Sequence, residues 1–177
     1  GMSLVLGSVP LVGAQTGRAD LMALARPLSF LLFFFVALAY VCLTVSFVGH
    51  DFSVRYVAAL SNTALPLEYR IAGVWGGHEG SLLLWLELLA VWTVSVAIFS
   101  RQMPLAMVAR VLGVLGLVSV GFLMFILTTS NPFDRLFPMP ADGRDLNPLL
   151  QDIGLIMHPP MLYMGYVGFS VAFAFAI

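Results

Sequence analysis

The residue with the clearest chemical potential is His158, which stands directly before Pro159 and Pro160. A proline lacks an amide hydrogen and disfavours helical backbone in the residue before it, so we expect an extended conformation at His158. A neutral imidazole held in this way suits the iron of a haem as an axial ligand. One histidine before two prolines is not specific, and a hydrogen-bonded histidine at the membrane interface stays an alternative.

A second group of candidates is the segment Trp-Gly-Gly-His-Glu-Gly-Ser at residues 75–81. Its glycines predict tight or left-handed turns, and Glu79 and Ser81 suit the start of a helix. In this interpretation the segment only ends a loop and caps a helix. The alternative is that His78 and Glu79 form a polar lip beside a ligand or ion path, since ionisable groups at the entrance of a membrane span are costly unless paired or used.

Two further features concern single side chains inside apolar runs. Glu87 lies where an unpaired charge costs roughly 3 kcal/mol, so we expect it to be neutral or paired with another span, with a role in transport or haem handling as the alternative. Tyr163 and Tyr166 recur three positions apart and give one helix edge an aromatic character. The single cysteine, Cys42, excludes an internal disulfide and a CxxCH site for covalent haem.

The elements that carry these residues are strongly apolar. The chain is 60% hydrophobic and 10% charged, with a mean hydropathy of +1.00, which is outside the range of soluble globular domains. Four runs of about twenty apolar residues can each cross a bilayer as a helix: 28–48, 81–99, 107–127 and 155–177. We interpret residues 2–14 as the trailing part of one more span. The sequence therefore predicts an all-α, polytopic membrane helix bundle of about five spans.

The spans belong to one predicted membrane domain over residues 1–177, whose first and last helices look truncated, as in the N-terminal part of a longer protein. The connections 15–27 and 100–106 are short, whereas 49–80 and 128–154 are long and rich in Gly, Pro, Asn and aromatic residues. Long irregular loops usually carry function. Arginines concentrated near the short connections place these in the cytoplasm and both long loops outside. A net charge of −1 leaves no basic surface for nucleic acid.

Residues 75–85, 146–152 and 158–168 closely resemble the CcmF, NrfE and CycK family of haem lyase subunits, and residues 131–135 and 56–66 also match. The resemblance implies a subunit in the bacterial inner membrane, with its long loops in the periplasm. Such a subunit takes haem from the chaperone CcmE and attaches it to the CxxCH thiols of apocytochrome c. The partners implied are haem, CcmE, apocytochrome c, membrane lipid and the apocytochrome-handling subunits of the CcmH and CcmI type.

For single residues, the resemblance implies that His158 is an axial ligand of haem iron and assigns no catalytic residue. Four other side chains are candidates for haem contact: Trp75, His78, Glu79 and Tyr163. The family's tryptophan-rich segment and its other haem histidines are absent from these 177 residues, so we expect weak haem binding and no lyase activity from them alone. The motifs do not separate CcmF from the NrfE type, which serves a nitrite reductase. A transporter or channel subunit and a structural scaffold remain alternatives from other classes.

Overall fold

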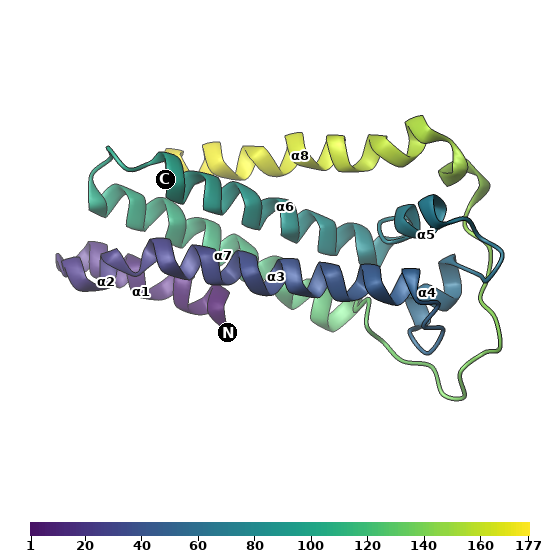
Figure 1. The fold of residues 1–177 in the computed structure, drawn as a ribbon. Coiled ribbons are helices and arrows are strands. Elements are labelled where there is room, and N and C mark those ends of the chain that lie inside the picture. The colour runs from purple at the N-terminus through teal and green to yellow at the C-terminus, as the bar shows by residue number, and fades with distance from the viewer. The chain divides into compact units, whose positions relative to one another are not determined.

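The computed structural model describes residues 1–177, which form helices joined by loops (Figure 1). The helices are α1 Met2–Thr16, α2 Ala19–Ala23, α3 Ala25–Val48, α4 Arg55–Leu60, α5 Leu67–Gly73, α6 His78–Phe99, α7 Leu105–Thr129, the 3₁₀ helix η1 Pro148–Gln151, and α8 Ile153–Ala176. There is no β-strand, only an isolated bridge between Val54 and Arg135. The predicted all-α class is confirmed.

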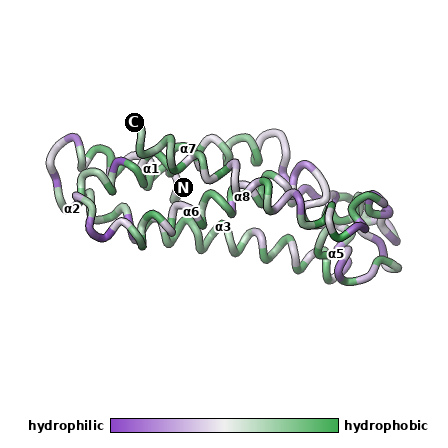
Figure 2. Tube along the Cα trace, turned by 90° about the horizontal axis from the view of Figure 1, so that it is seen from above, coloured by the Kyte–Doolittle hydropathy of each residue, from purple (hydrophilic) through white to green (hydrophobic).

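Four helical segments are long and apolar enough to cross a membrane: Ala19–Val48, α6, α7 and α8. The shorter α1 is also apolar. Hydrophobic residues follow the helices, and hydrophilic residues gather in the connections between them (Figure 2). This chain is therefore a multi-pass membrane protein.

The helices α3, α6, α7 and α8 each begin two or three residues before the predicted apolar runs, and in α6 and α8 this changes the place of a candidate residue. α6 begins at His78 rather than at residue 81, so Ser81 is not its N-cap; the Ser81 hydroxyl instead donates to the carbonyl of Trp75 at 2.9 Å. α8 begins at Ile153, which places His158 and both prolines inside the helix. The expectation of an extended backbone at His158 is wrong. Prolines are tolerated in membrane helices where other groups satisfy the carbonyls that they leave free.

The chain divides into two compact units. Unit 1 comprises residues 1–37, 86–124 and 164–177. In unit 1 the backbones of α1 and α7 approach closely, because a Cβ on Gly116 would lie 2.8 Å from the amide nitrogen of Gly7. Small residues permit this kind of contact between membrane helices. Arg26 donates to the carbonyls of Ala97 at 3.1 Å and Ser100 at 3.0 Å, and so satisfies acceptors that the end of α6 leaves open.

Unit 2 comprises residues 38–85 and 125–163 and contains both long loops. Its buried core is Leu43, Phe47, Phe52, Val54, Tyr56, Val57, Ala58, Val74 and Leu83. The backbones of the two loops are hydrogen-bonded to each other. The amide of Arg55 donates to Asp134 O at 2.7 Å, that of Leu136 to Ser53 O at 2.7 Å, and that of Arg144 to Ala58 O at 2.8 Å. Unit 2 is therefore the part of the chain that holds the predicted functional loops in one arrangement.

Candidate functional site

Tyr56 of α4 fixes the segment that precedes α6. Its ring is buried, and its hydroxyl donates to the carbonyl of Val74 at 3.2 Å and accepts from the amide of Gly77 at 2.9 Å. Burial raises the pKa of the Tyr56 phenol well above its usual range, so the hydroxyl keeps its proton at any ordinary pH. The Trp-Gly-Gly-His-Glu-Gly-Ser segment is thus held from α4, a contact that the sequence analysis did not anticipate.

The glycines of this segment serve close packing rather than left-handed turns. None has a positive φ, so the left-handed alternative is wrong. The expected tight turn is present, because the amide of Gly76 donates to Gly73 O at 3.0 Å. A Cβ on Gly77 would lie 2.9 Å from Tyr56 Cε2, and a Cβ on Gly80 would collide with the carbonyl oxygen of Val74. A side chain at Gly80 would therefore displace backbone, not merely a flexible neighbour.

Ion pairs and hydrogen bonds join the side chains of the two long loops. Arg135 binds Asp51 at 2.8 Å, and Arg55 binds Asp134 at 3.4 Å. The Ser53 hydroxyl donates to Asp51, and this bond, followed by the Arg135 guanidinium, lowers the pKa of the Asp51 carboxyl. These pairs were missed by the sequence analysis. Each long loop contains both basic and acidic residues, which allows ion pairs between the loops but does not say which residues form them.

Asp142 also joins the two long loops, and the sequence did not predict its partner either. Its carboxylate accepts from the amide of Thr63 at 3.0 Å and from the Thr63 hydroxyl at 2.8 Å. Hydrogen bonds from Thr63, first from its side chain, lower the pKa of Asp142. Asp51, Asp134 and Asp142 are therefore structural anchors between the loops.

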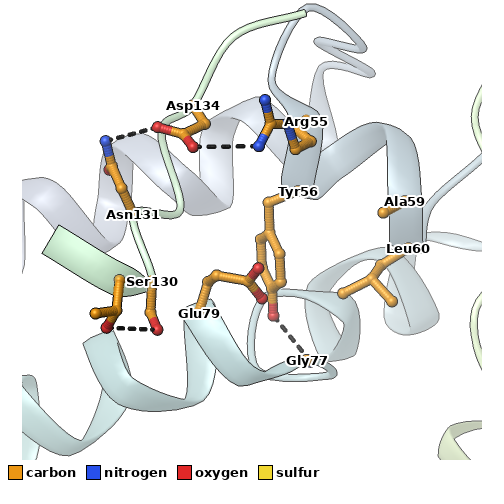
Figure 3. A pocket seen from close by; sticks show the side chains of 10 residues that line it. Arg55, Tyr56, Ala59, Leu60, Gly77, Glu79, Ser130, Asn131 and Asp134 are labelled. Atoms are coloured by element: carbon orange, nitrogen blue, oxygen red, sulfur yellow. Dashed lines mark hydrogen bonds and ion pairs between the residues drawn. The ribbon is translucent and has the colours of Figure 1, made fainter. Parts of the chain in front are cut away.

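A cavity of about 260 Å³ lies beside Tyr56 (Figure 3). It is lined by Arg55, Tyr56, Ala59, Leu60, Gly77, Glu79, Thr129, Ser130, Asn131 and Asp134. Sites that enclose ligands of drug or cofactor size are typically 300–1,000 Å³. The cavity is therefore suited to one small group and cannot enclose a haem.

His78 and Glu79, both in the first turn of α6, lie in different surroundings. Glu79 is half-buried, and its carboxylate points into the cavity next to Tyr56 (Figure 3). His78 lies with Nδ1 at 3.1 Å from the Ser130 hydroxyl and with its ring edge-on to Phe125 at a centroid distance of 6.2 Å. The two side chains do not share hydrogen-bond partners.

His158 is exposed in the second turn of α8 and has no hydrogen-bond partner within the chain. The alternative of a hydrogen-bonded interfacial histidine is therefore not supported. Residues three or four positions away share its helix face, and these include Leu155, Met161 and Leu162, which are 44%, 70% and 39% exposed. The imidazole thus stands free on an apolar surface.

Trp75 and Tyr163 contact the other elements of unit 2 rather than standing free beside His158. The Trp75 indole nitrogen donates to the carbonyl of Ile156 at 3.0 Å. The Tyr163 ring meets Trp85 edge-on at 5.1 Å. Both residues therefore hold α8 in position, and neither offers an open surface to a ligand.

Of the two states expected for Glu87, neutral or paired with another span, the structure shows no pair. Its Oε2 atom is buried without a hydrogen-bond partner, so the predicted pairing with another span is not formed within this chain. An isolated carboxylate in a span is costly when charged, and protonation removes that cost.

Residues 75–177 match the family model described as cytochrome C assembly protein. The chain belongs to this family. Over 177 residues it is 62% identical to the cytochrome c-type biogenesis protein CcmF of Pseudomonas aeruginosa, covering 99% of this chain and 27% of that protein. It is 61% identical to CcmF of Escherichia coli over 178 residues, or 28% of that protein. The cytochrome c-type biogenesis protein NrfE of Haemophilus influenzae is 48% identical over 172 residues, which favours the CcmF type.

A solved structure, described as cytochrome c heme lyase CcmF, has the same fold. The TM-score is 0.81 at 27% identity, over 98% of this chain and 27% of that one. The chain thus spans about a quarter of the length of the relatives that it matches. Family membership favours cytochrome c assembly over the transporter or channel alternative.

Proposed function

We propose that this chain forms the haem-docking part of a CcmF-type cytochrome c haem lyase in the bacterial inner membrane, with both long loops in the periplasm. The observation that carries the proposal is His158, a free and exposed imidazole on an apolar helix face. It occurs in a chain that belongs to the cytochrome c assembly family.

The residues around His158 fit haem as a substrate. A ring nitrogen of the neutral imidazole is an axial ligand of iron, and apolar side chains suit the faces of a porphyrin. Leu155, Met161 and Leu162 provide such side chains on the same face of α8. Stable low-spin binding needs a second axial ligand, which we assign to residues beyond this chain. No side chain here is assigned to bond formation between haem and thiol.

Trp75 and Tyr163 are positioning residues in this proposal. They hold the start of α8 through Ile156 and Trp85, and so set where the His158 imidazole stands. His78, at the outer end of α6, is the further candidate for contact with bound haem. The residue is exposed, and because Ser130 occupies Nδ1, the other ring nitrogen is the one left for such a contact.

The partners follow from the proposed lyase role. CcmE delivers haem, apocytochrome c receives it, and subunits of the CcmH and CcmI type present the apocytochrome. The product is a thioether-linked haem on the cytochrome, formed outside the membrane.

The test uses the full-length parent protein in a strain that lacks its own lyase, with a reporter c-type cytochrome detected by haem staining. His158→Ala is expected to abolish staining at an unchanged protein level. Met157→Ala is the matched control, an exposed residue of α8 that is not among the proposed porphyrin contacts, and we expect it to retain most of the staining. Equal staining with wild type and His158→Ala would reject the ligand role. No staining with the wild-type parent would reject the lyase role itself.

A further inference from the structure

The carboxylates of the two long loops are almost all engaged within the chain. Every aspartate in these loops accepts at least one hydrogen bond: Asp51, Asp134, Asp142, Asp145 and Asp152. Glu68 has no partner, but it is exposed on α5 and is solvated by water. Glu79 is different, because it is half-buried and still receives no hydrogen bond and no ion pair from the chain.

The other polar groups of the cavity already have partners. The Tyr56 hydroxyl donates and accepts once each, and the Asn131 amide donates to Asp134 at 3.0 Å. The Ser130 hydroxyl lies against His78. The Arg55 guanidinium is committed to Asp134 at the rim (Figure 3). Glu79 is therefore the one uncommitted charge that points into this cavity.

We propose that the cavity receives a single cationic side chain, a lysine or an arginine, from a partner polypeptide that docks on the loops of unit 2. The Glu79 carboxylate would bind the ammonium or guanidinium group, a charge-assisted contact that is stronger than a neutral hydrogen bond. Ala59 and Leu60 on the cavity wall would contact the aliphatic stem. A volume of about 260 Å³ accommodates one such side chain.

Two other occupants fit less well. Calcium takes six to eight oxygen ligands, whereas Asp134 is already held by Arg55 and Asn131, and no group of three or more acidic, histidine or cysteine side chains that could hold a metal occurs in the chain. A haem exceeds the cavity. The lining belongs to the long loops, to α4 and to the terminal residues of α6 and α7, such as Glu79 and Thr129, so a polypeptide in the water phase can reach it.

The test is carboxylate labelling of the full-length parent protein, first in membranes with its natural partners and then purified from them in detergent. A water-soluble carbodiimide with glycinamide labels accessible carboxylates, and without glycinamide it joins a carboxylate to a lysine in direct contact. Glu79 is expected to be protected in membranes and labelled after purification. Glu68 is the internal control and should be labelled in both states. A lysine partner would also give a cross-linked peptide between Glu79 and a second polypeptide, which Glu79→Gln should remove.

Labelling of Glu79 in membranes to the same extent as Glu68 would show an open cavity and overturn the proposal. So would Glu79 that resists labelling in both states, since its protection would then not come from a partner. A cross-link from Glu79 to another part of its own chain would overturn the partner assignment. Protection that appears only when n-butylammonium or methylguanidinium is added to the purified protein would indicate a site for small cations only. None of these readouts depends on haem.

Discussion

The indole nitrogen of Trp75 lies 3.0 Å from the carbonyl oxygen of Ile156 and donates a hydrogen bond to it. In a regular α-helix this carbonyl would accept the amide hydrogen of residue 160, which is a proline and has none. Trp75 therefore replaces the donor that Pro160 removes. Because Ile156 is two residues from His158, this one bond ties the segment before α6 to the helix that carries the proposed haem ligand.

Trp75→Phe should keep the ring and remove the bond. Ile156 O would then be a largely buried acceptor without a donor, which costs about 1–3 kcal/mol of unfolding free energy. Thermal unfolding of the full-length protein in detergent measures this. The absorption spectrum of bound haem should also change, which loss of stability alone would not cause in the protein that remains folded.

Two further variants control for the size of the ring and for the proline. Trp92→Phe loses a comparable bond to Met164 O, but Gly168 still supplies an amide hydrogen there, so the effect should be smaller. Pro160→Ala restores the helical donor to Ile156 O and should reduce the cost of Trp75→Phe. Additive effects of Trp75→Phe and Pro160→Ala would contradict the coupling.

Tyr56→Phe tests the anchor of the segment before α6. The variant leaves the amide of Gly77 and the carbonyl of Val74 without the hydroxyl, so we expect a loss of about 1–3 kcal/mol. Hydrogen exchange should accelerate at the Gly77 amide. Tyr69→Phe on α5 serves as the comparison, and an equal loss from both variants would contradict a special role for Tyr56.

Gly80→Ala should prevent unit 2 from packing, because its Cβ would collide with the Val74 carbonyl and lie 2.6 Å from the Tyr56 hydroxyl. Gly121→Ala in α7 is the matched control. No atom lies within 4 Å of a Cβ built there, and alanine favours a helix over glycine by roughly 1 kcal/mol. Folded yield in detergent should fall sharply for Gly80→Ala and stay unchanged for Gly121→Ala. Equal yields would mean that the close approach at Gly80 is not required.

The loop contacts should weaken in acid. The folded state lowers the pKa values of Asp51 and Asp142, so each stabilises the protein above its unfolded pKa of about 3.9 and loses this contribution as the pH falls through the folded value. Limited proteolysis of the loops should therefore be slow at pH 7 and faster below about pH 4. Asp51→Asn should flatten this dependence in part. Because Arg135 is exposed, its ion pair should contribute only about 1 kcal/mol or less.

The all-α class, the membrane-length helices and the family follow from the amino-acid sequence alone. Helix length follows from the thickness of the bilayer, so long apolar runs such as 107–127 place a span without knowledge of its neighbours. The motifs at residues 75–85, 146–152 and 158–168 carry the resemblance to the haem lyase family, and the match to the cytochrome c assembly family confirms it. The role of His158 as a haem ligand is still a prediction, although its free imidazole on an apolar face agrees with it.

How these motifs act together depends on contacts between residues that are far apart in the chain. His158 is helical despite two prolines because a donor 81 positions away, Trp75, satisfies the carbonyl of Ile156. Glu79 is left without a partner because the neighbouring acceptors and donors pair with one another, as Asp134 does with Arg55. Secondary-structure propensity and hydropathy describe how one segment of the chain behaves in water or in lipid. They contain no term for a hydrogen bond between residues that are far apart in the chain, and such bonds are what set the site.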